Sequence, residues 1–364
     1  MPELAPDWHE KVIPPITTIL LTLPRLGNPY LSQSSYSILS DLLSASVNSG
    51  TQSSTEQIPV VLSAVLSSPP PKSDITVASS WLRVLGDVML AYRSADPEAS
   101  SQEFIKVWKT VWSFFETSHA QARKAAAQAL ESLAGCITLP MACTAVVDAP
   151  DSKSPVRTAI AQITKALDSL AYASAIPELL HVVRSFILNL NMRLKNGIST
   201  LAAETLLLPL VQKIADLRIQ KNFEHKETAD NVISTAMRVI GPAVMLEAMP
   251  LNLEPQDRFV IDPRVLRSTE LFFRQAGREP RAFLLPMLSQ PHPSPLGHFV
   301  SYFVPLSERM FNLQNKAEAD GRQSEAKVWN VLISQVWVGF AGYCHAPPDV
   351  KDASEYHSFP CPSI

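Results

Sequence analysis

The chain has 364 residues, of which 46% are hydrophobic and 18% are charged. This composition is that of a folded protein with one large or two ordinary domains, and it excludes disorder over most of the length. The 31 basic and 34 acidic residues give a formal charge of −3, which excludes a global basic field that would hold nucleic acid and leaves only local contacts with RNA.

Apolar residues recur at helical spacing along most of the chain, and the first two segments with this pattern are 36–47 and 58–66. The next segment, 97–116, predicts a helix with one broad apolar face, and we expect its aromatic residues to lie in the core rather than to stack on bases. In 118–135, alanines at helical spacing would let two helices approach closely. The apolar face of 97–116 consists of Phe104, Val107, Trp108, Val111, Trp112 and Phe115.

Helical spacing continues in 156–173, 178–194, 202–217 and 228–240. Most of the 30 prolines stand at the edges of such runs, where the first turn of a helix tolerates them. No period-2 run of β-branched residues is long enough to predict a sheet. Helix pairs of about 35 to 45 residues predict an all-α fold, an α-solenoid of HEAT- or armadillo-like antiparallel helix pairs. An irregular all-α bundle is the alternative.

A glycine and a proline mark the end of the last of these helices. We expect Gly241 to end 228–240 in a left-handed C-cap, and Pro242 to begin a short helix that runs through Met249. Pro250 would then close that helix. The joints between the other helices are short and rich in Pro, Ser, Asn and Gly, which favours one continuous helical-repeat array over two separate globules.

The compartment is indicated by the cysteines and by the apolar stretches. The longest stretches, such as 12–24, are interrupted by proline and are shorter than the roughly 20 residues of a membrane helix, so we expect no membrane span. Acidic residues precede this stretch, which argues against a signal peptide.

The cysteines form no CxxC pair and are too few for a disulfide framework, so we expect reduced thiols in an intracellular protein. They are Cys136, Cys143, Cys344 and Cys361.

The sequence contains none of the short motifs that carry common enzyme chemistry. GxxxxGK[ST] and GxGxxG are absent, and so are HExxH and GxSxG. His292 and His298 bracket the run "PHPSPLGH", but no carboxylate or thiol lies close to them in the sequence, so we interpret them as turn histidines rather than metal ligands. We therefore expect no catalytic, cofactor-binding or metal-binding residues.

The densest positive region of the chain gives the one set of candidate contact residues. If 202–217 is a helix, Lys213 falls near its C-terminal end and Arg218 just beyond, where cations interact favourably with the helix dipole. The alternative is a basic ridge that touches the phosphates of RNA or an acidic partner. The candidate residues are Arg193, Lys195, Lys213, Arg218 and Lys221.

Several long blocks of the chain form a recognisable set. In the second half these blocks are 241–253 ("GPAVMLEAMPLNL"), 278–310 and 325–344, and in the first half they are 27–43, 79–92 and 122–133. In sequence and in order, these blocks resemble the fungal ribosomal RNA-processing protein 12 family of nucleolar HEAT-repeat proteins. The resemblance extends to about residue 348, and no block is a catalytic motif.

The resemblance implies a non-enzymatic scaffold in small-subunit maturation, with roles in pre-ribosomal RNA processing and in the nuclear export of pre-ribosomes. It implies a location in the nucleus and nucleolus, with shuttling to the cytoplasm. The partners implied are pre-ribosomal RNA and assembly factors of the 90S and pre-40S particles, together with the Ran GTPase and karyopherins, and no membrane or small-molecule substrate. A karyopherin-like transport adaptor that binds a GTPase or cargo directly is the alternative function.

The sequence departs from the family pattern in length and at two places. Family members are several times longer, so we expect this chain to be an internal part of the array. Residues 259–274 interrupt a connection that would otherwise run from 251–258 almost directly into 275–286, and we predict an extra loop or a retained intron. The expected organisation is a continuous HEAT-like array over 1–346 and an irregular tail over 347–364.

Overall fold

The structure is a computed structural model that describes residues 7–49, 57–147, 154–196, 198–254, 279–345 and 347–349. Most of these residues lie in helices, which confirms the all-α fold. The chain divides into two compact units, Met1–Leu207 and Leu208–Ile364, and the boundary falls inside a helix. The continuity of the array over 1–346 stays a prediction. The insertion at 259–274 and most of the expected tail lie outside the described residues.

The first unit contains nine α-helices among its described residues, with short 3-10 turns between some of them. In chain order these are α1 (Asp7–Thr22), η1 (Leu23–Leu26), α2 (Pro29–Ser49), α3 (Gln57–Leu66), α4 (Ile75–Ala95), α5 (Pro97–Trp112), η2 (Ser113–Glu116), α6 (Ala120–Gly135), α7 (Leu139–Val147), α8 (Pro155–Ala166), η3 (Leu170–Ala175) and α9 (Ile176–Asn189).

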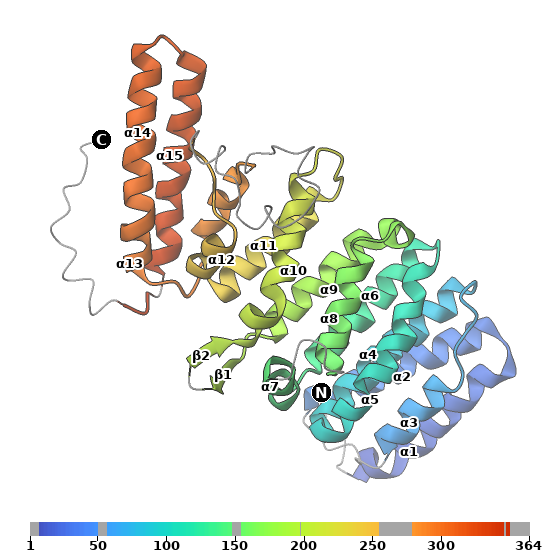
Figure 1. The fold of residues 1–364 in the computed structure, drawn as a ribbon. Helices are drawn as coiled ribbons and strands as arrows, with labels where there is room; N and C mark the ends of the chain where they lie inside the picture. The colour runs from blue at the N-terminus through green and yellow to red at the C-terminus, as the bar shows by residue number, and fades with distance from the viewer. Residues whose placement is uncertain are drawn as a thin grey trace. The chain divides into compact units, whose positions relative to one another are not determined.

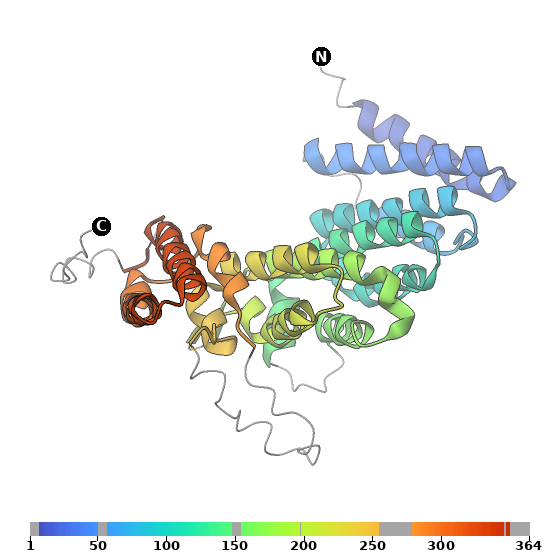
Figure 2. The ribbon, with the colours of Figure 1, turned by 90° about the horizontal axis from the view of Figure 1, so that it is seen from above.

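The helices of this unit form two layers. Helices α2, α4, α6 and α9 pack side by side in one layer, each against the next (Figure 1). Helices α3, α5 and α8 form the second layer, in which α5 contacts α4, α6 and α8. Figure 2 shows the unit from above, with the helices stacked in succession from blue to green. This arrangement of consecutive helix pairs is that of HEAT repeats.

The core of the first unit is built from the aromatic and alanine faces that the sequence predicts. Trp108 is fully buried and Trp112 almost so, which confirms that they are core residues. Ala126 and Ala129 of α6 are also buried. A Cβ atom at Gly86 of α4 would lie 3.3 Å from the Cα of Ala129, so α4 and α6 are in close contact. The prediction that the alanines allow close approach of two helices is therefore confirmed.

Apolar character is concentrated in α6 and α7. Within the described residues no single helix is both long and apolar enough to cross a membrane, although α6 and α7, bent by 88° at their junction, pass that test as a pair. The apolar side chains of this pair include Leu130, Leu133 and Ala142, all of which are fully buried in the unit.

The helix expected over 178–194 is shorter in the structure and is followed by strands, so the prediction of no sheet was wrong here. Helix α9 ends at Asn189, and β1 (Arg193–Asn196) pairs antiparallel with β2 (Ile198–Leu201). The dipeptide Asn196-Gly197 is a hairpin signal in a sequence, although Asn196 belongs to β1 here and pairs with Ile198. Strands of four residues are too short to produce a visible period-2 pattern.

The second unit contains shorter helices followed by a long helical hairpin. Helix α10 (Ala202–Ile219) crosses the boundary between the units. It is followed by α11 (Lys226–Ile240), α12 (Pro242–Ala248), the 3-10 helix η6 (Ala282–Ser289), α13 (Leu296–His298), the π-helical turn η7 (Phe299–Phe303), α14 (Val304–Ala319) and α15 (Gln323–Cys344). Helices α14 and α15 pack against each other, and η6 packs along α15 and also contacts α11 (Figure 1).

Gly241 joins α11 to α12, but its conformation differs from the expected left-handed cap. Its φ is +99° and its ψ is 147°, so φ is positive while ψ lies far from the left-handed helical region. The physical reason is Pro242, since the ring of a proline disfavours helical ψ values in the residue before it. The Oγ of Ser294 lies beside this joint and accepts a hydrogen bond of 3.2 Å from the Ala243 N–H. Pro242 is the first residue of α12, as expected, whereas the helix ends at Ala248 rather than Met249.

Candidate interaction surface

The structure places the five predicted basic residues in two different units. Arg193 is exposed on β1, and Lys195 lies on the same strand, with a side chain outside the described residues. Lys213 is half-buried on α10, and Lys221 is exposed in the turn that follows this helix. The grouping of all five into one ridge stays a prediction.

Arg218, the fifth of these residues, has contacts inside the protein. Its Nε and Nη2 atoms donate hydrogen bonds of 2.7 Å and 3.1 Å to the two carboxylate oxygens of Asp230 on α11. Its Cζ atom lies 4.1 Å from the ring centroid of Phe283 on η6. Bidentate pairing with a carboxylate fixes the plane of a guanidinium, and a cation over an aromatic face is attracted by the ring quadrupole. Arg218 therefore holds Phe283 in place.

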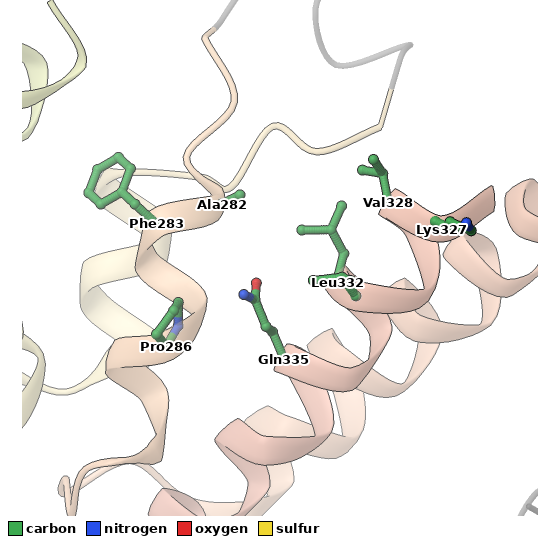
Figure 3. Close-up of a pocket in the computed structure, with 8 residues that line it drawn as sticks. Ala282, Phe283, Pro286, Lys327, Val328, Leu332 and Gln335 are labelled. Carbon is green, nitrogen blue, oxygen red and sulfur yellow. The ribbon is translucent and has the colours of Figure 1, made fainter. Parts of the chain in front are cut away.

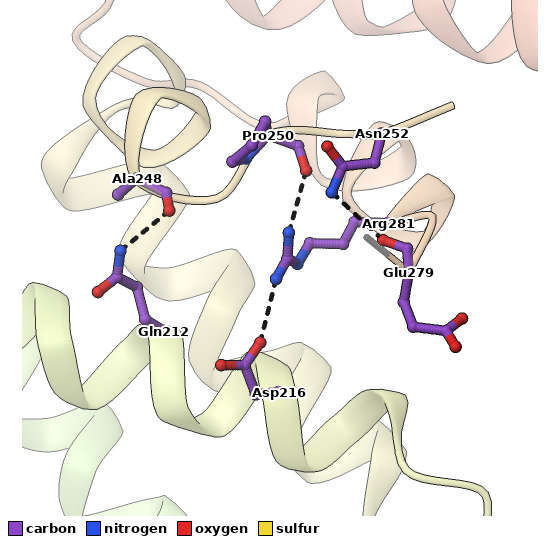
Figure 4. Close-up of polar contacts among 7 residues, drawn as sticks. All are labelled: Gln212, Asp216, Ala248, Pro250, Asn252, Glu279 and Arg281. Carbon is purple, nitrogen blue, oxygen red and sulfur yellow. Dashed lines mark hydrogen bonds and ion pairs between the residues drawn. The ribbon is translucent and has the colours of Figure 1, made fainter. Parts of the chain in front are cut away.

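Arg281 forms a second connection at the start of η6 (Figure 4). Its Nη2 donates to the Asp216 carboxylate on α10 at 3.1 Å, and its Nη1 donates to the Pro250 carbonyl at 3.3 Å. Its backbone N–H donates to the Leu251 carbonyl at 2.7 Å. One side chain thus ties η6 both to α10 and to the segment that follows α12.

Two further hydrogen bonds reinforce this connection (Figure 4). The amide of Gln212 on α10 donates to the Ala248 carbonyl at 2.9 Å, and the amide of Asn252 donates to the Glu279 carbonyl at 3.4 Å. Asn252 itself has a φ of 51°, a conformation that asparagine tolerates better than most residues. The segments on the two sides of residues 255–278 are therefore fixed next to each other.

An apolar groove lies between η6 and α15, with a volume of about 460 Å³ (Figure 3). Two of its α15 residues, Val328 and Val331, have 57% and 55% of their surface exposed. The sequence patterns did not predict this groove. Its signal was that α15 carries apolar residues on all sides, including the side that faces solvent. The lining residues are Ala282, Phe283 and Pro286 from η6, and Lys327, Val328, Val331, Leu332 and Gln335 from α15.

The two histidines that were expected in turns contact Tyr343 of α15. His292 lies in the loop before α13, whereas His298 is the last residue of α13. The Nδ1 atom of His298 and the hydroxyl of Tyr343 are 2.8 Å apart, and the His292 ring meets the Tyr343 ring edge-on at 4.3 Å between centroids. His292 is buried, and this burial lowers its pKa to about 4, with a further contribution from the charge of His298. Among the described residues no cluster of three or more His, Cys, Asp or Glu side chains could hold a metal ion.

Residues 116–356 match the family model described as the HEAT repeats of ribosomal RNA-processing protein 12. A Schizosaccharomyces pombe protein named after ribosomal RNA-processing protein 12 is 26% identical over 286 residues, which are 78% of this chain and 21% of that protein. An RRP12-like protein of Gallus gallus is 31% identical over 39% of this chain and 10% of its own length. An RRP12-like protein of Homo sapiens is 23% identical over 96% of this chain and 25% of its own length. The chain thus spans a quarter or less of these relatives.

Proposed function

The chain belongs to the ribosomal RNA-processing protein 12 family, and on this premise we propose that it is a non-enzymatic HEAT-repeat scaffold in ribosome biogenesis that supports the processing of pre-ribosomal RNA. The observation that carries the proposal is the family match over residues 116–356, which begins just before α6 and continues through α15. A scaffold of stacked helix pairs binds through many modest contacts on extended faces, which suits a large ribonucleoprotein partner.

The finer proposal concerns the steps and the partners. We infer that the protein acts in maturation of the small subunit, within nucleolar 90S and pre-40S particles, and in their export from the nucleus. Ran and karyopherins are the transport partners in this proposal. The names of the relatives support rRNA processing in those proteins, and the extension to this chain rests on shared family membership.

The proposal also includes local contacts with rRNA phosphates. Arg193 and Lys221 are exposed, and Lys195 and Lys213 are the other lysines in the set that we propose to contact RNA or an acidic partner. Such phosphate contacts contribute affinity without sequence specificity, and they weaken as salt rises. Arg218 is the weakest member of the set, because Asp230 already neutralises its charge.

Sedimentation of the tagged protein from cells tests the scaffold role. Co-migration with 90S or pre-40S particles is the expected result. Absence from these fractions, together with salt-stable binding to Ran-GTP alone, would instead support the karyopherin-like adaptor.

Crosslinking of the tagged protein to RNA, followed by peptide mapping, tests the basic contacts. We expect crosslinks in peptides that include Lys221, and we expect the charge reversal Lys221→Glu to reduce them. Lys109→Glu, at an exposed position on α5 outside the proposed set, is the matched control and should leave crosslinking unchanged. An equal loss in both variants would contradict a specific role for Lys221.

A further inference from the structure

We propose that the groove between η6 and α15 docks an amphipathic helix of a partner protein, which inserts apolar side chains between the groove walls and places a carboxylate beside Lys327. The inference rests on the proposed scaffold role, since it gives that scaffold a specific protein partner. It assigns a use to apolar surface that is exposed in the described part of the chain.

The apolar contacts of this helix would come from both walls. Val328 and Val331 are one turn apart on α15 and more than half exposed. Ala282 and Pro286 line the η6 side of the groove, whereas the ring of Phe283 points away from α15 (Figure 3). Apolar side chains that line a concave surface on a folded protein mark a binding site more often than scattered single residues do. A volume of about 460 Å³ accepts a few side chains, which is what one helix face offers.

The length of the groove also fits a helix. Its α15 residues run from Lys327 to Gln335, and at a rise of about 1.5 Å per residue this corresponds to roughly 12 Å, or two helical turns. A partner helix with apolar residues at positions i, i+4 and i+7 covers the same distance. No strand edge contributes to the groove among the described residues that line it, so addition of a β-strand is not the mode that this geometry favours.

Charge decides the chemistry of the partner. Lys327 is the one charged residue among those that line the groove, and within the described part of the chain it forms no ion pair. The nearby guanidinium groups of Arg218 and Arg281 already have carboxylate partners in Asp230 and Asp216. The unmatched charge at the rim is therefore positive and favours a carboxylate. A single cation on an apolar surface is a poor site for RNA, which is held by several phosphate contacts.

Contacts within the chain hold the η6 side of the groove in place without a partner. Phe283 lies under the guanidinium of Arg218, and Arg281 anchors the start of η6 to α10. A wall that is already ordered loses little conformational entropy on binding, so the contacts made there contribute more fully to affinity.

The test uses the purified chain and two fluorescent helical peptides of about 16 residues, long enough to hold a helix when docked. Both peptides carry leucine at i, i+4 and i+7, and they differ only in flanking glutamate or lysine. Fluorescence anisotropy should show the glutamate peptide binding about tenfold more tightly than the lysine peptide, and Lys327→Glu should reverse this order. Equal binding of both peptides, or no binding, would overturn the proposal.

Two valines on α15 provide the matched variants. Val331→Asp should weaken binding of the glutamate peptide by about tenfold or more, since it places a negative charge among the apolar side chains that line the groove. Val338→Asp is the control, because Val338 is 60% exposed on the same helix but does not line the groove. Both positions are exposed, so neither variant is expected to unfold the chain. An equal loss of binding in the two variants would count against the groove.

Other occupants give distinct results, each of which overturns the proposal. Displacement of the peptide by a short RNA oligonucleotide would assign the groove to RNA. Self-association that Val331→Asp removes would assign it to a second copy. Peptide binding that is absent in the complete chain and appears only after deletion of 259–274 would assign it to this chain. The peptide result does not depend on ribosomes, so failure of the protein to sediment with pre-ribosomal particles would refute the proposed function and leave the docking site standing.

Discussion

Gly241 combines an unfavourable backbone conformation with a close side-chain neighbour. Its φ of +99° is unfavourable for any residue with a Cβ atom, and a Cβ there would lie 2.8 Å from the Oγ of Ser294. We expect Gly241→Ala to lower the free energy of unfolding by about 1 to 3 kcal/mol, as measured by urea denaturation. Gly27→Ala is the control, because Gly27 also has positive φ but nothing lies within 4 Å of its Cβ position. Equal losses in the two variants would show that neither the extended ψ of Gly241 nor its contact with Ser294 adds to the cost of a positive φ.

The buried imidazole of His292 makes stability depend on pH. Burial lowers its pKa to about 4 in the folded chain, against 6.5 as the ordinary value, so the fold favours the neutral ring. The unfolded chain then binds more protons between these two values. The contribution of His292 to stability is therefore complete above pH 6.5 and is lost as the pH falls toward 4. The loss amounts to about 3 kcal/mol at most. Burial lowers the pKa of His298 as well, which acts in the same direction.

Urea denaturation at pH 7.5 and pH 5 measures this dependence. We expect the wild-type chain to lose more stability between the two pH values than the variant His292→Leu, which keeps an apolar side chain against Tyr343 but cannot titrate. The difference between the two losses isolates His292, because His298 is present in both proteins. Identical losses would show that protonation of His292 is not linked to unfolding.

Arg218 shows why a charged residue is hard to interpret from sequence. The sequence places it just beyond the helix expected over 202–217, whereas it lies in the last turn of α10, which continues to Ile219. Its partners are Asp230 on the next helix and Phe283, which follows a long stretch of chain. Neither contact is visible in a local pattern. Spacing along one helix predicts neighbours on that helix only, whereas contacts between elements depend on the tertiary fold.

The close packing of the helices α4 and α6 can be tested by a substitution at Gly86. A Cβ atom at Gly86 would lie 3.1 Å from the Cβ of Ser132 and 3.3 Å from the Cα of Ala129. Gly86→Val therefore forces the two helices apart, and we expect a loss of about 1 to 3 kcal/mol in the free energy of unfolding. Gly135→Val is the matched control, since the nearest atom to its Cβ position is at an ordinary 3.5 Å. Equal stability of the two variants would contradict tight packing of α4 on α6.

Helices with strong apolar periodicity were predictable, and their ends were not. The expected helix at 156–173 is two elements in the structure, α8 (Pro155–Ala166) and η3 (Leu170–Ala175). The spacing of apolar residues continues through both, because a 3-10 turn also brings residues three apart to one side. Only backbone hydrogen bonds distinguish them, such as that from the Ser169 N–H to the Ala166 carbonyl at 3.1 Å. The hairpin of β1 and β2 was not predicted for the opposite reason, because its strands are too short to show periodicity in the sequence.

At the scale of the whole molecule, the sequence predicted the repeat architecture because each helix pair has the same local signature. It could not predict the groove of η6 and α15, which depends on how two segments of different helix type pack. Val328 and Val331 look like ordinary core residues in the sequence, and only the fold shows that more than half of their surface is exposed in the part of the chain that the structure describes. Interaction surfaces on such a scaffold are properties of the assembled helices rather than of a motif.

Deletion of 259–274 tests whether this segment is an insertion into the fold. Arg281 and Asn252 hold the two flanking segments next to each other, with 3.4 Å between the Asn252 amide nitrogen and the Glu279 carbonyl. Joining Arg258 directly to Gln275 leaves eight residues between Glu254 and Glu279. Eight residues reach about 26 Å when extended, which is ample for ends that are so close.

Loop-closure entropy changes by only about 0.6 kcal/mol for each doubling of loop length, so deletion of 259–274 should alter the free energy of unfolding by about 1 kcal/mol or less. Thermal unfolding of the two chains measures this, and complementary-DNA reads joining Arg258 to Gln275 would identify the segment as a retained intron. Arg281→Ala is the comparison variant, because it removes the contacts with Asp216 and Pro250. It should lower the stability of both the shortened and the complete chain. A large loss of stability on deletion alone would mean that 259–274 packs on the second unit, and the segment would then be part of the fold rather than an insertion into it.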